Sequence, residues 1–181
     1  PHKMRLGGVF HGAIRRAGKI IDEWEDHNLV VNEGLNSLLD IMFHGSTQIT
    51  TWYIGVFEGN YTPVSSVTAA TITAASTEST AYDESTRVAY NEAAASGQSI
   101  TNTANRATGT FNATETIYGA FLVSASAKSA TTGTLFSAAR FGTAKNVVDD
   151  DELLLTYSFT AASAYCSTKK TSSKHSSPDK T

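Results

Sequence analysis

Apolar residues recur with the spacing of an α-helix in one stretch of this chain and with the pattern of β-strands in most of the rest. Between residues 28 and 45, apolar residues recur three and four positions apart, which places them on one face of a helix. These residues are Val31, Leu35, Leu38, Leu39 and Met42. Asn32 is a suitable N-cap and Gly45 a suitable stop, so we expect an amphipathic helix at about Asn32–Phe43. Its apolar stripe, including Leu38 or Leu39, should be buried against a sheet.

The rest of the chain is dominated by short runs with the pattern of β-strands. Residues 4–16 and 19–24 flank the turn dipeptide Ala17-Gly18 and predict an N-terminal β-hairpin. Runs rich in apolar, aromatic and β-branched residues predict eight further strands. They lie at residues 50–58, 77–83, 86–91, 99–102, 106–112, 116–124, 134–140 and 152–160. Residues 64–75 have little pattern and are expected to form a long surface loop with room for a short helical turn.

Many short strands separated by turns predict a mainly β fold. We expect an antiparallel β-sandwich or jelly-roll-like domain with one packed amphipathic α-helix and an N-terminal β-hairpin. The length of 181 residues suits one domain with a sizeable core. We divide the chain into a hairpin arm (residues 1–26), a sandwich domain with one helix (27–162) and a polar Lys/Ser-rich C-terminal tail (163–181).

The composition indicates surfaces that a partner can cover at low cost. Charged residues make up 17% of the chain, below the roughly 25% of typical soluble domains, and Thr, Ser and Ala take their place. Such surfaces lose little side-chain entropy when they are buried. The net charge is −3, with +3 in residues 167–181 and −6 in the remainder, so the chain as a whole has no basic field that would attract nucleic acid.

Candidate chemistry is sparse. A single cysteine, Cys166, leaves no intramolecular disulfide and no Cys-based metal cluster. No apolar run approaches the length of a membrane span, and the N-terminal residues lack a secretory signal pattern, so we expect neither a span nor export. The five histidines are scattered, and no serine lies in a nucleophile motif. The acidic run Asp149–Glu152 matches no calcium loop and is expected to be a solvated turn. We therefore predict no catalytic residue, no metal, no cofactor and no enzyme.

Five motifs follow one another between Asn28 and Thr160. They are NLVVNEGLNSLLDIMFHGSTQITTWYIGVFEG (Asn28 to Gly59), TAYDESTRVAYNEAAAS (Thr80 to Ser96), IYGAFLVS (Ile117 to Ser124), GTLFSAARF (Gly133 to Phe141) and VVDDDELLLTYSFT (Val147 to Thr160). As an ordered series they resemble a recurrent type of tailed-bacteriophage structural protein. The resemblance implies a virion component without enzymatic activity. Proteins of this type are variously regarded as capsid decoration (cement) proteins or as tail and fibre-associated proteins.

The first hypothesis is therefore a phage capsid decoration protein that binds the outside of the head shell in many copies and stabilises it. It would be located on the virion, at the capsid surface. Its partners would be the major capsid protein and neighbouring copies of itself, as a dimer or trimer. No specific nucleic acid and no membrane are expected as partners.

Six residues on the hairpin and the tail are the candidate partner contacts. They are Arg15, Arg16, Trp24, Lys169, Lys170 and Lys174. Two alternatives stay open. One is a tail, neck or fibre-attachment protein with the same fold, and the other is a carbohydrate-binding module that stacks sugars on Trp52, Tyr53 and Tyr61.

Overall fold

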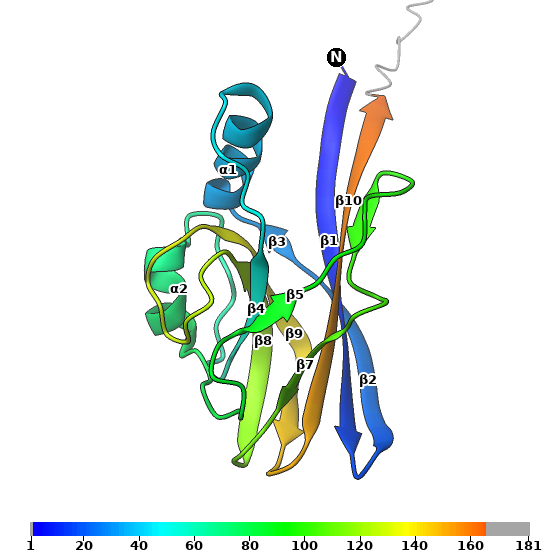
Figure 1. The fold of residues 1–181 in the computed structure, drawn as a ribbon, viewed down its shortest axis with the longest axis vertical. Helices are drawn as coiled ribbons and strands as arrows, with labels where there is room; N and C mark the ends of the chain where they lie inside the picture. The colour runs from blue at the N-terminus through cyan, green and yellow to red at the C-terminus, as the bar shows by residue number, and fades with distance from the viewer. Residues whose placement is uncertain (1, 166–181) are drawn as a thin grey trace, which may run out of the picture.

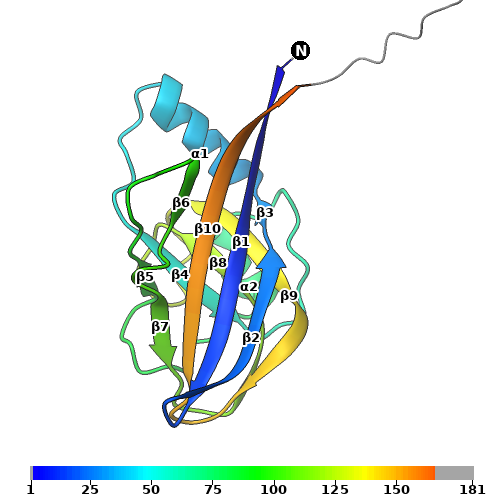
Figure 2. The ribbon, with the colours of Figure 1, turned by 90° about the vertical axis from the view of Figure 1, so that its right-hand side faces the viewer.

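The computed structural model describes residues 2–165, in which two antiparallel sheets lie face to face and two helices flank them (Figures 1 and 2). This confirms the predicted mainly β fold with a little helix. The tail predicted for residues 163–181 lies outside the described residues from Cys166 onward, and residues 163–165 belong to the last strand.

Sheet A contains the hairpin and has the strand order β2-β1-β10-β6, with β7 also paired to β10. Its strands are β1 (His2–Arg16), β2 (Lys19–His27), β6 (Ser99–Thr101), β7 (Ala107–Thr110) and β10 (Glu152–Tyr165). The longest pairing joins β1 to β10, from His2 opposite Tyr165 to Arg15 opposite Glu152. Both ends of the described chain therefore lie at the same end of the molecule (Figure 2).

Sheet B has the order β3-β9-β8-β4-β5. Its strands are β3 (Leu29–Val30), β4 (Trp52–Phe57), β5 (Val88–Tyr90), β8 (Glu115–Val123) and β9 (Leu135–Val147). The second half of β9 approaches β2 of sheet A (Figure 2). There the Gly142 N–H donates to Asp26 Oδ1 at 3.0 Å and Lys145 Nζ donates to Asp22 Oδ2 at 2.9 Å. These side-chain contacts close one edge of the sandwich.

The predicted hairpin is confirmed, but it is not an arm separate from the sandwich. Ala17 and Gly18 both have positive φ, at 47° and 77°, which is the conformation that a two-residue hairpin turn of the primed type requires. β1 is then flanked by β2 and β10, and Phe10 and Ile14 are buried in the core. The division at residue 26 was wrong because β1 supplies an internal strand of sheet A.

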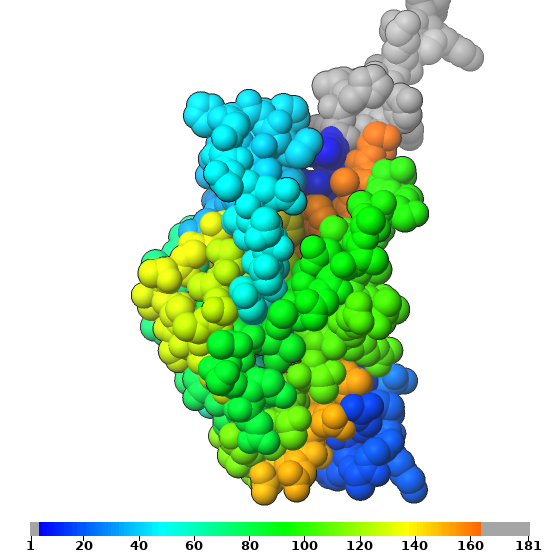
Figure 3. Space-filling view, in the orientation of Figure 1, coloured from blue at the N-terminus to red at the C-terminus, as the bar shows by residue number. Residues whose placement is uncertain are grey.

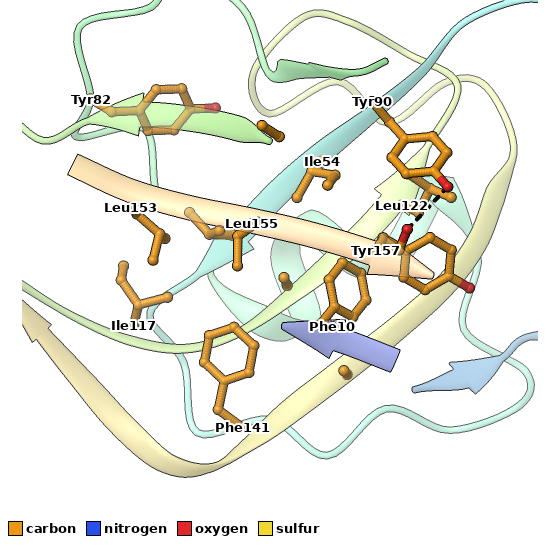
Figure 4. Packing of buried hydrophobic residues seen from close by; sticks show 14 of the residues in the cluster. Phe10, Ile54, Tyr82, Tyr90, Ile117, Leu122, Phe141, Leu153, Leu155 and Tyr157 are labelled. Carbon is orange, nitrogen blue, oxygen red and sulfur yellow. Dashed lines mark hydrogen bonds between the residues drawn. The ribbon is translucent and has the colours of Figure 1, made fainter. Parts of the chain in front are cut away.

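The main core lies between the two sheets. Alternate residues of β10, namely Leu153, Leu155 and Tyr157, point into it (Figure 4). Polar groups at its centre are satisfied: the Tyr157 hydroxyl accepts a hydrogen bond from Asn28 Nδ2 at 2.8 Å. The Tyr90 hydroxyl donates to the Tyr157 backbone oxygen at 3.1 Å (Figure 4). Burying these groups with their partners avoids the cost of unpaired polar atoms.

Helix α1 (Asn32–Phe43) has the predicted bounds, but the predicted cap and packing were wrong. The N-cap position is Val31, and no side chain caps it. The buried residue of the helix is Gly34, where an added Cβ would collide with the backbone of Phe136 on β9. The helix thus touches β9 closely in its first turn and then extends beyond the upper end of sheet B (Figure 1). Its remaining apolar side chains gain little from the sandwich.

Helix α2 (Ala69–Ser76) lies where we predicted a surface loop. Thr68 and Thr71 form a reciprocal capping box at its start. Ile72 is fully buried against the outer face of sheet B, and with Phe57 and Phe121 it belongs to a second apolar cluster. Sheet B is therefore covered on both faces, by sheet A and by α2.

The strand predicted at residues 77–83 is reduced to isolated bridges. Glu78 pairs with Phe57, and Tyr82 pairs with Phe111, with no continuous ladder between them. Side chains hold this segment in place instead. Lys128 Nζ donates to the backbone oxygens of Thr80 at 3.1 Å and Tyr82 at 2.6 Å.

Candidate interaction surface

No metal centre is found in the part of the chain that the structure describes. Among residues 2–165, no group of three or more His, Cys, Asp or Glu side chains is placed to hold a metal ion. No helix among these residues is long and apolar enough to cross a membrane. The described residues instead offer surfaces that a partner molecule could contact, and some of them carry the predicted contact residues.

Arg15 and Arg16 are both held in ion pairs within the chain. Arg15 Nη2 donates to Glu152 Oε1 at 2.6 Å, and Arg16 donates to both carboxylate oxygens of Asp151 at 2.7 and 2.6 Å. These hydrogen bonds raise the pKa of each arginine and hold the pKa of Asp151 and of Glu152 below their ordinary values. The two arginines therefore join the end of β1 to the start of β10, and only their exposed edges can meet a partner.

The acidic turn before β10 is only partly solvated. Asp149 and Asp150 are exposed, as predicted, but the Asp151 side chain is 0% exposed beneath Arg16. The Val148 N–H also donates to Asp151 Oδ2 at 2.9 Å. The prediction of a solvated run was wrong for this residue because Arg16 lies close in space but far away in sequence.

Trp24 packs where β2 approaches β9 and is only partly exposed. Its indole covers Gly12, where an added Cβ would collide with the ring. The ring also meets Phe141 edge-on at 5.3 Å between centroids, and Lys145 Nζ lies 4.3 Å from its centre. Trp24 Nε1 is buried with no hydrogen-bond partner among residues 2–165. Trp24 thus serves packing and does not extend the surface of the two arginines.

The lysines Lys169, Lys170 and Lys174 lie outside the described residues. Their attachment point is nevertheless fixed by β10, which ends at Tyr165 opposite His2. The last described strand residue, Tyr165, therefore lies at the end of the molecule opposite the hairpin turn (Figure 1).

An apolar groove of about 480 Å³ opens at the same end, between α1 and the ends of the strands. Side chains of α1 form one wall and the upper part of the core forms the other. The lining includes Leu38, Ile41, Met42, Trp52, Phe136 and Phe159. Figure 3 shows α1, in cyan, beside the ends of β1, in blue, and β10, in orange. Glu92 is the charged residue in the lining.

The helix beside this groove exposes part of the apolar stripe that the sequence predicted to be buried, and also Phe43, which lies outside that stripe; Val31 of the stripe is fully buried. Phe43 is 80% exposed, Met42 64% and Leu39 49%, and Leu38 is only partly buried. Met4 on β1 is also exposed. Large apolar residues gathered in this way are typical of surfaces that bind another molecule. We call the groove together with Leu39, Met42 and Phe43 the α1 surface.

Trp52 and Tyr61, two of the three aromatic residues proposed for sugar stacking, do not share a platform. Trp52 packs edge-on against Phe136 on the side of sheet B that faces sheet A. Tyr61 packs edge-on against Phe57, in the cluster on the opposite face of sheet B. Their rings are therefore used in two separate places.

No protein-family model matches the chain, and no curated protein matches it either. The phage family therefore stays a resemblance, carried by the ordered motifs between Asn28 and Thr160.

Proposed function

We propose that this protein is a capsid decoration protein of a tailed bacteriophage, located on the virion. It binds the outside of the head shell in many copies and stabilises the shell, in contact with the major capsid protein and with neighbouring copies of itself. It has no enzymatic role. The observation that carries this proposal is the α1 surface, an apolar helix face and groove left open at one end of a rigid sandwich.

The energetic argument for a protein partner is direct. Burying a Met or Phe side chain contributes roughly 1.5–3 kcal/mol, so Leu39, Met42 and Phe43 together offer a substantial driving force for docking. Among the residues that line the groove, Glu92 is the charged one, which keeps the entropic cost of covering the groove low. A shell presents the same docking site many times, which suits a small non-catalytic module of this kind.

The runner-up is a tail, neck or fibre-attachment protein that uses the same surface. The two proposals differ in copy number and not in fold. A carbohydrate-binding module has weaker support, because Trp52 and Tyr61 lie on opposite faces of sheet B.

The decisive measurement is the copy number per virion, by quantitative mass spectrometry against the major capsid protein. A number equal to that of the capsid subunit, or a simple fraction of it, supports decoration of the shell. About a dozen copies or fewer would favour the tail or neck, because those structures have low-order rotational symmetry. Absence from purified virions would overturn both.

A matched pair of variants tests the surface itself. Met42→Ser/Phe43→Ser should keep the unfolding free energy within about 1 kcal/mol, because both side chains are largely exposed, but should lose binding to particles. Val64→Ser removes an exposed apolar residue outside the α1 surface and should bind like the parent. Particle binding unchanged in the double variant would exclude the α1 surface as the contact.

A further inference from the structure

The two ends of the molecule differ strongly in charge. Residues 1–8 and 159–181 hold six of the 14 Lys and Arg residues and one of the 17 Asp and Glu residues, a net charge of +5. Because the whole chain carries −3, residues 9–158 carry −8. The pairing of His2 with Tyr165 places residues 2–8 and 159–165 at the end that carries the α1 surface, and the tail continues in sequence from Tyr165. Glu33 and Asp40 of α1 and Glu92 of the groove belong to the same end, so the net charge of +5 becomes 5 − 3 = +2.

The opposite end, around the hairpin turn, is acidic and partly apolar. A cleft of about 640 Å³ opens there, lined by Ile21, Asp22, Glu58 and Glu115 among others. The cation in its lining, Arg16, is already engaged by Asp151, and the lining carboxylate Asp22 is engaged by Lys145. Glu58 and Glu115 form no ion pair within residues 2–165.

Exposed apolar and acidic side chains border this cleft. Ile20 and Ile21 are both about half exposed beside the turn. Asp149 and Asp150 are exposed in the loop that follows Val148, a residue of the cleft wall. We call this region the hairpin end.

We propose that copies of this protein associate head to tail, with the hairpin end of one copy covering the α1 surface of the next. Ile20 and Ile21 of one copy lie against Met42 and Phe43 of its neighbour. The neighbour's tail lysines enter the cleft at Glu58 and Glu115, and Lys19 beside the turn faces Glu92 in the groove. The inference rests on the proposed function and deepens it, because it names a neighbouring copy on the shell as the partner that covers the α1 surface. Met42→Ser/Phe43→Ser then loses particle binding because the contacts between neighbouring copies are lost.

The number of residues after Tyr165 limits which cleft the tail lysines can reach. β10 has 14 residues and spans about 46 Å, at roughly 3.3 Å per residue, from the hairpin end to Tyr165. Lys174 lies nine residues beyond Tyr165, so its reach is at most about 32 Å, and Lys169 and Lys170 reach less. These three lysines cannot return to the cleft of their own copy. Only Lys180 lies far enough along the chain to do so.

Charge also selects this geometry over a two-fold dimer. A two-fold contact would place the α1 end against itself or the hairpin end against itself, with like charges facing each other. The head-to-tail contact places the positive end on the negative one. Such an interface is heterologous and closes into a ring when the rotation between copies allows. A ring of three agrees with the trimer, one of the two assemblies (dimer or trimer) expected from the sequence.

The test mixes two variants of the full-length protein and follows their size by sedimentation. The tail variant is Lys169→Gln/Lys170→Gln/Lys174→Gln, and the cleft variant is Glu58→Gln/Glu115→Gln. The parent should self-associate, more weakly at about 0.5 M than at about 0.05 M salt. Each variant alone should associate at least tenfold more weakly. The equimolar mixture should form a 1:1 heterodimer that grows no further, because it contains one intact junction.

Several outcomes would overturn the inference. They are a parent that stays monomeric up to about 1 mM, variants that associate like the parent, and a mixture that stays monomeric. If the mixture fails but Met42→Ser/Phe43→Ser still loses particle binding, the proposed function stands and the shell alone covers the α1 surface. If heterodimers form but virions lack the protein, the inference stands and the proposed function fails.

Discussion

Arg87 and Glu78 form a fully buried, two-pronged ion pair beneath the loops of sheet B. Arg87 Nε and Nη2 each donate to one oxygen of the Glu78 carboxylate at 2.7 Å. The guanidinium also donates to the backbone oxygens of Ala125 at 2.9 Å and Ala130 at 3.1 Å. The Ser129 N–H donates to Glu78 Oε2 at 2.9 Å. One ion pair thus fastens residues 78–87 to residues 125–130, two loops with little regular structure of their own.

Arg87→Met should be among the most destabilising single substitutions in the chain. It leaves the Glu78 carboxylate buried without its cation, at a cost of roughly 3–5 kcal/mol. Urea unfolding at pH 7 measures this loss. Arg15→Met is the matched control, because its pair with Glu152 has a similar two-pronged geometry but is about a third exposed and screened by water. Equal losses in the two variants would contradict the role given to burial.

The double variant Arg87→Met/Glu78→Leu separates charge from packing. If the unpaired carboxylate causes most of the loss, the double variant should be more stable than Arg87→Met alone. A double variant less stable than the single one would mean that the hydrogen bond from the Ser129 N–H to Glu78 stabilises the fold more than the unpaired carboxylate destabilises it.

Gly34→Ala should destabilise the protein even though alanine favours helices. In an exposed helix this change gains up to about 1 kcal/mol. Here the new methyl group collides with the backbone of Phe136, which cannot move aside as a side chain can, and we expect a net loss of roughly 1–3 kcal/mol. Gly7→Ala is the control, because nothing lies within 4 Å of a Cβ at that position. A higher melting temperature for Gly34→Ala would show that α1 is not seated on β9 through this residue.

Local signals in the sequence were sufficient for the hairpin and for the bounds of α1. Ala17-Gly18 predicts a two-residue turn, and the three- and four-residue spacing predicts a helix at Asn32–Phe43. Periodicity identifies an apolar face but does not say what covers it, so the exposure of Met42 and Phe43 could not be predicted. Helix α2 was missed because Thr71 takes the capping-box position where Glu or Gln is the usual signal.

Local sequence patterns also could not predict the partners of the candidate contact residues, because those partners lie far away in the sequence. Arg16 meets Asp151 across 135 residues, through the register of β1 on β10. No local pattern encodes that register, so the sequence presented Arg15 and Arg16 as free cations. The exposed helix stripe was visible in the sequence, but its role as a surface became apparent only once the packing of Gly34 on β9 was known.

Lowering the pH should reduce the free energy of unfolding, because Asp151 becomes protonated and its pairing with Arg16 is lost. Its hydrogen bonds from Arg16 lower its pKa in the folded protein below the unfolded value near 3.9. The pairing therefore stabilises the fold above about pH 4, and this contribution is lost as the pH falls through the folded value. Glu152, with its pKa lowered by Arg15, acts in the same direction.

The measurement is urea unfolding of the parent and of Asp151→Asn at several pH values. The variant should be less stable than the parent at pH 7, and its stability should fall less steeply below about pH 4. Asp149→Asn, an exposed neighbour in the same turn, should follow the parent within about 0.5 kcal/mol. Parallel pH profiles for the parent and Asp151→Asn would contradict the assignment.

Raising the pH above about 10 should destabilise the fold, because three buried tyrosines ionise more readily in the unfolded chain. Burial raises the pKa of Tyr82, Tyr90 and Tyr157 well above the ordinary value near 10. A raised folded pKa means that the stability contribution is complete below about pH 10 and is lost as the pH rises further. The three phenols should therefore ionise only as the chain unfolds. After a pH jump, an absorbance change at 295 nm equal to three of the seven tyrosines should accompany the loss of circular dichroism.

Two Tyr→Phe variants test which of the buried tyrosine hydroxyls stabilises the fold. Tyr157→Phe removes the acceptor for Asn28 and Ser137 and should cost roughly 1–3 kcal/mol, because each buried hydrogen bond contributes about 0.5–1.5 kcal/mol. The Tyr82 hydroxyl is buried with no hydrogen-bond partner among residues 2–165, so Tyr82→Phe should be neutral or stabilising. A Tyr82→Phe variant less stable than Tyr157→Phe would show that the Tyr82 hydroxyl is satisfied in solution and that the core network is not centred on Tyr157.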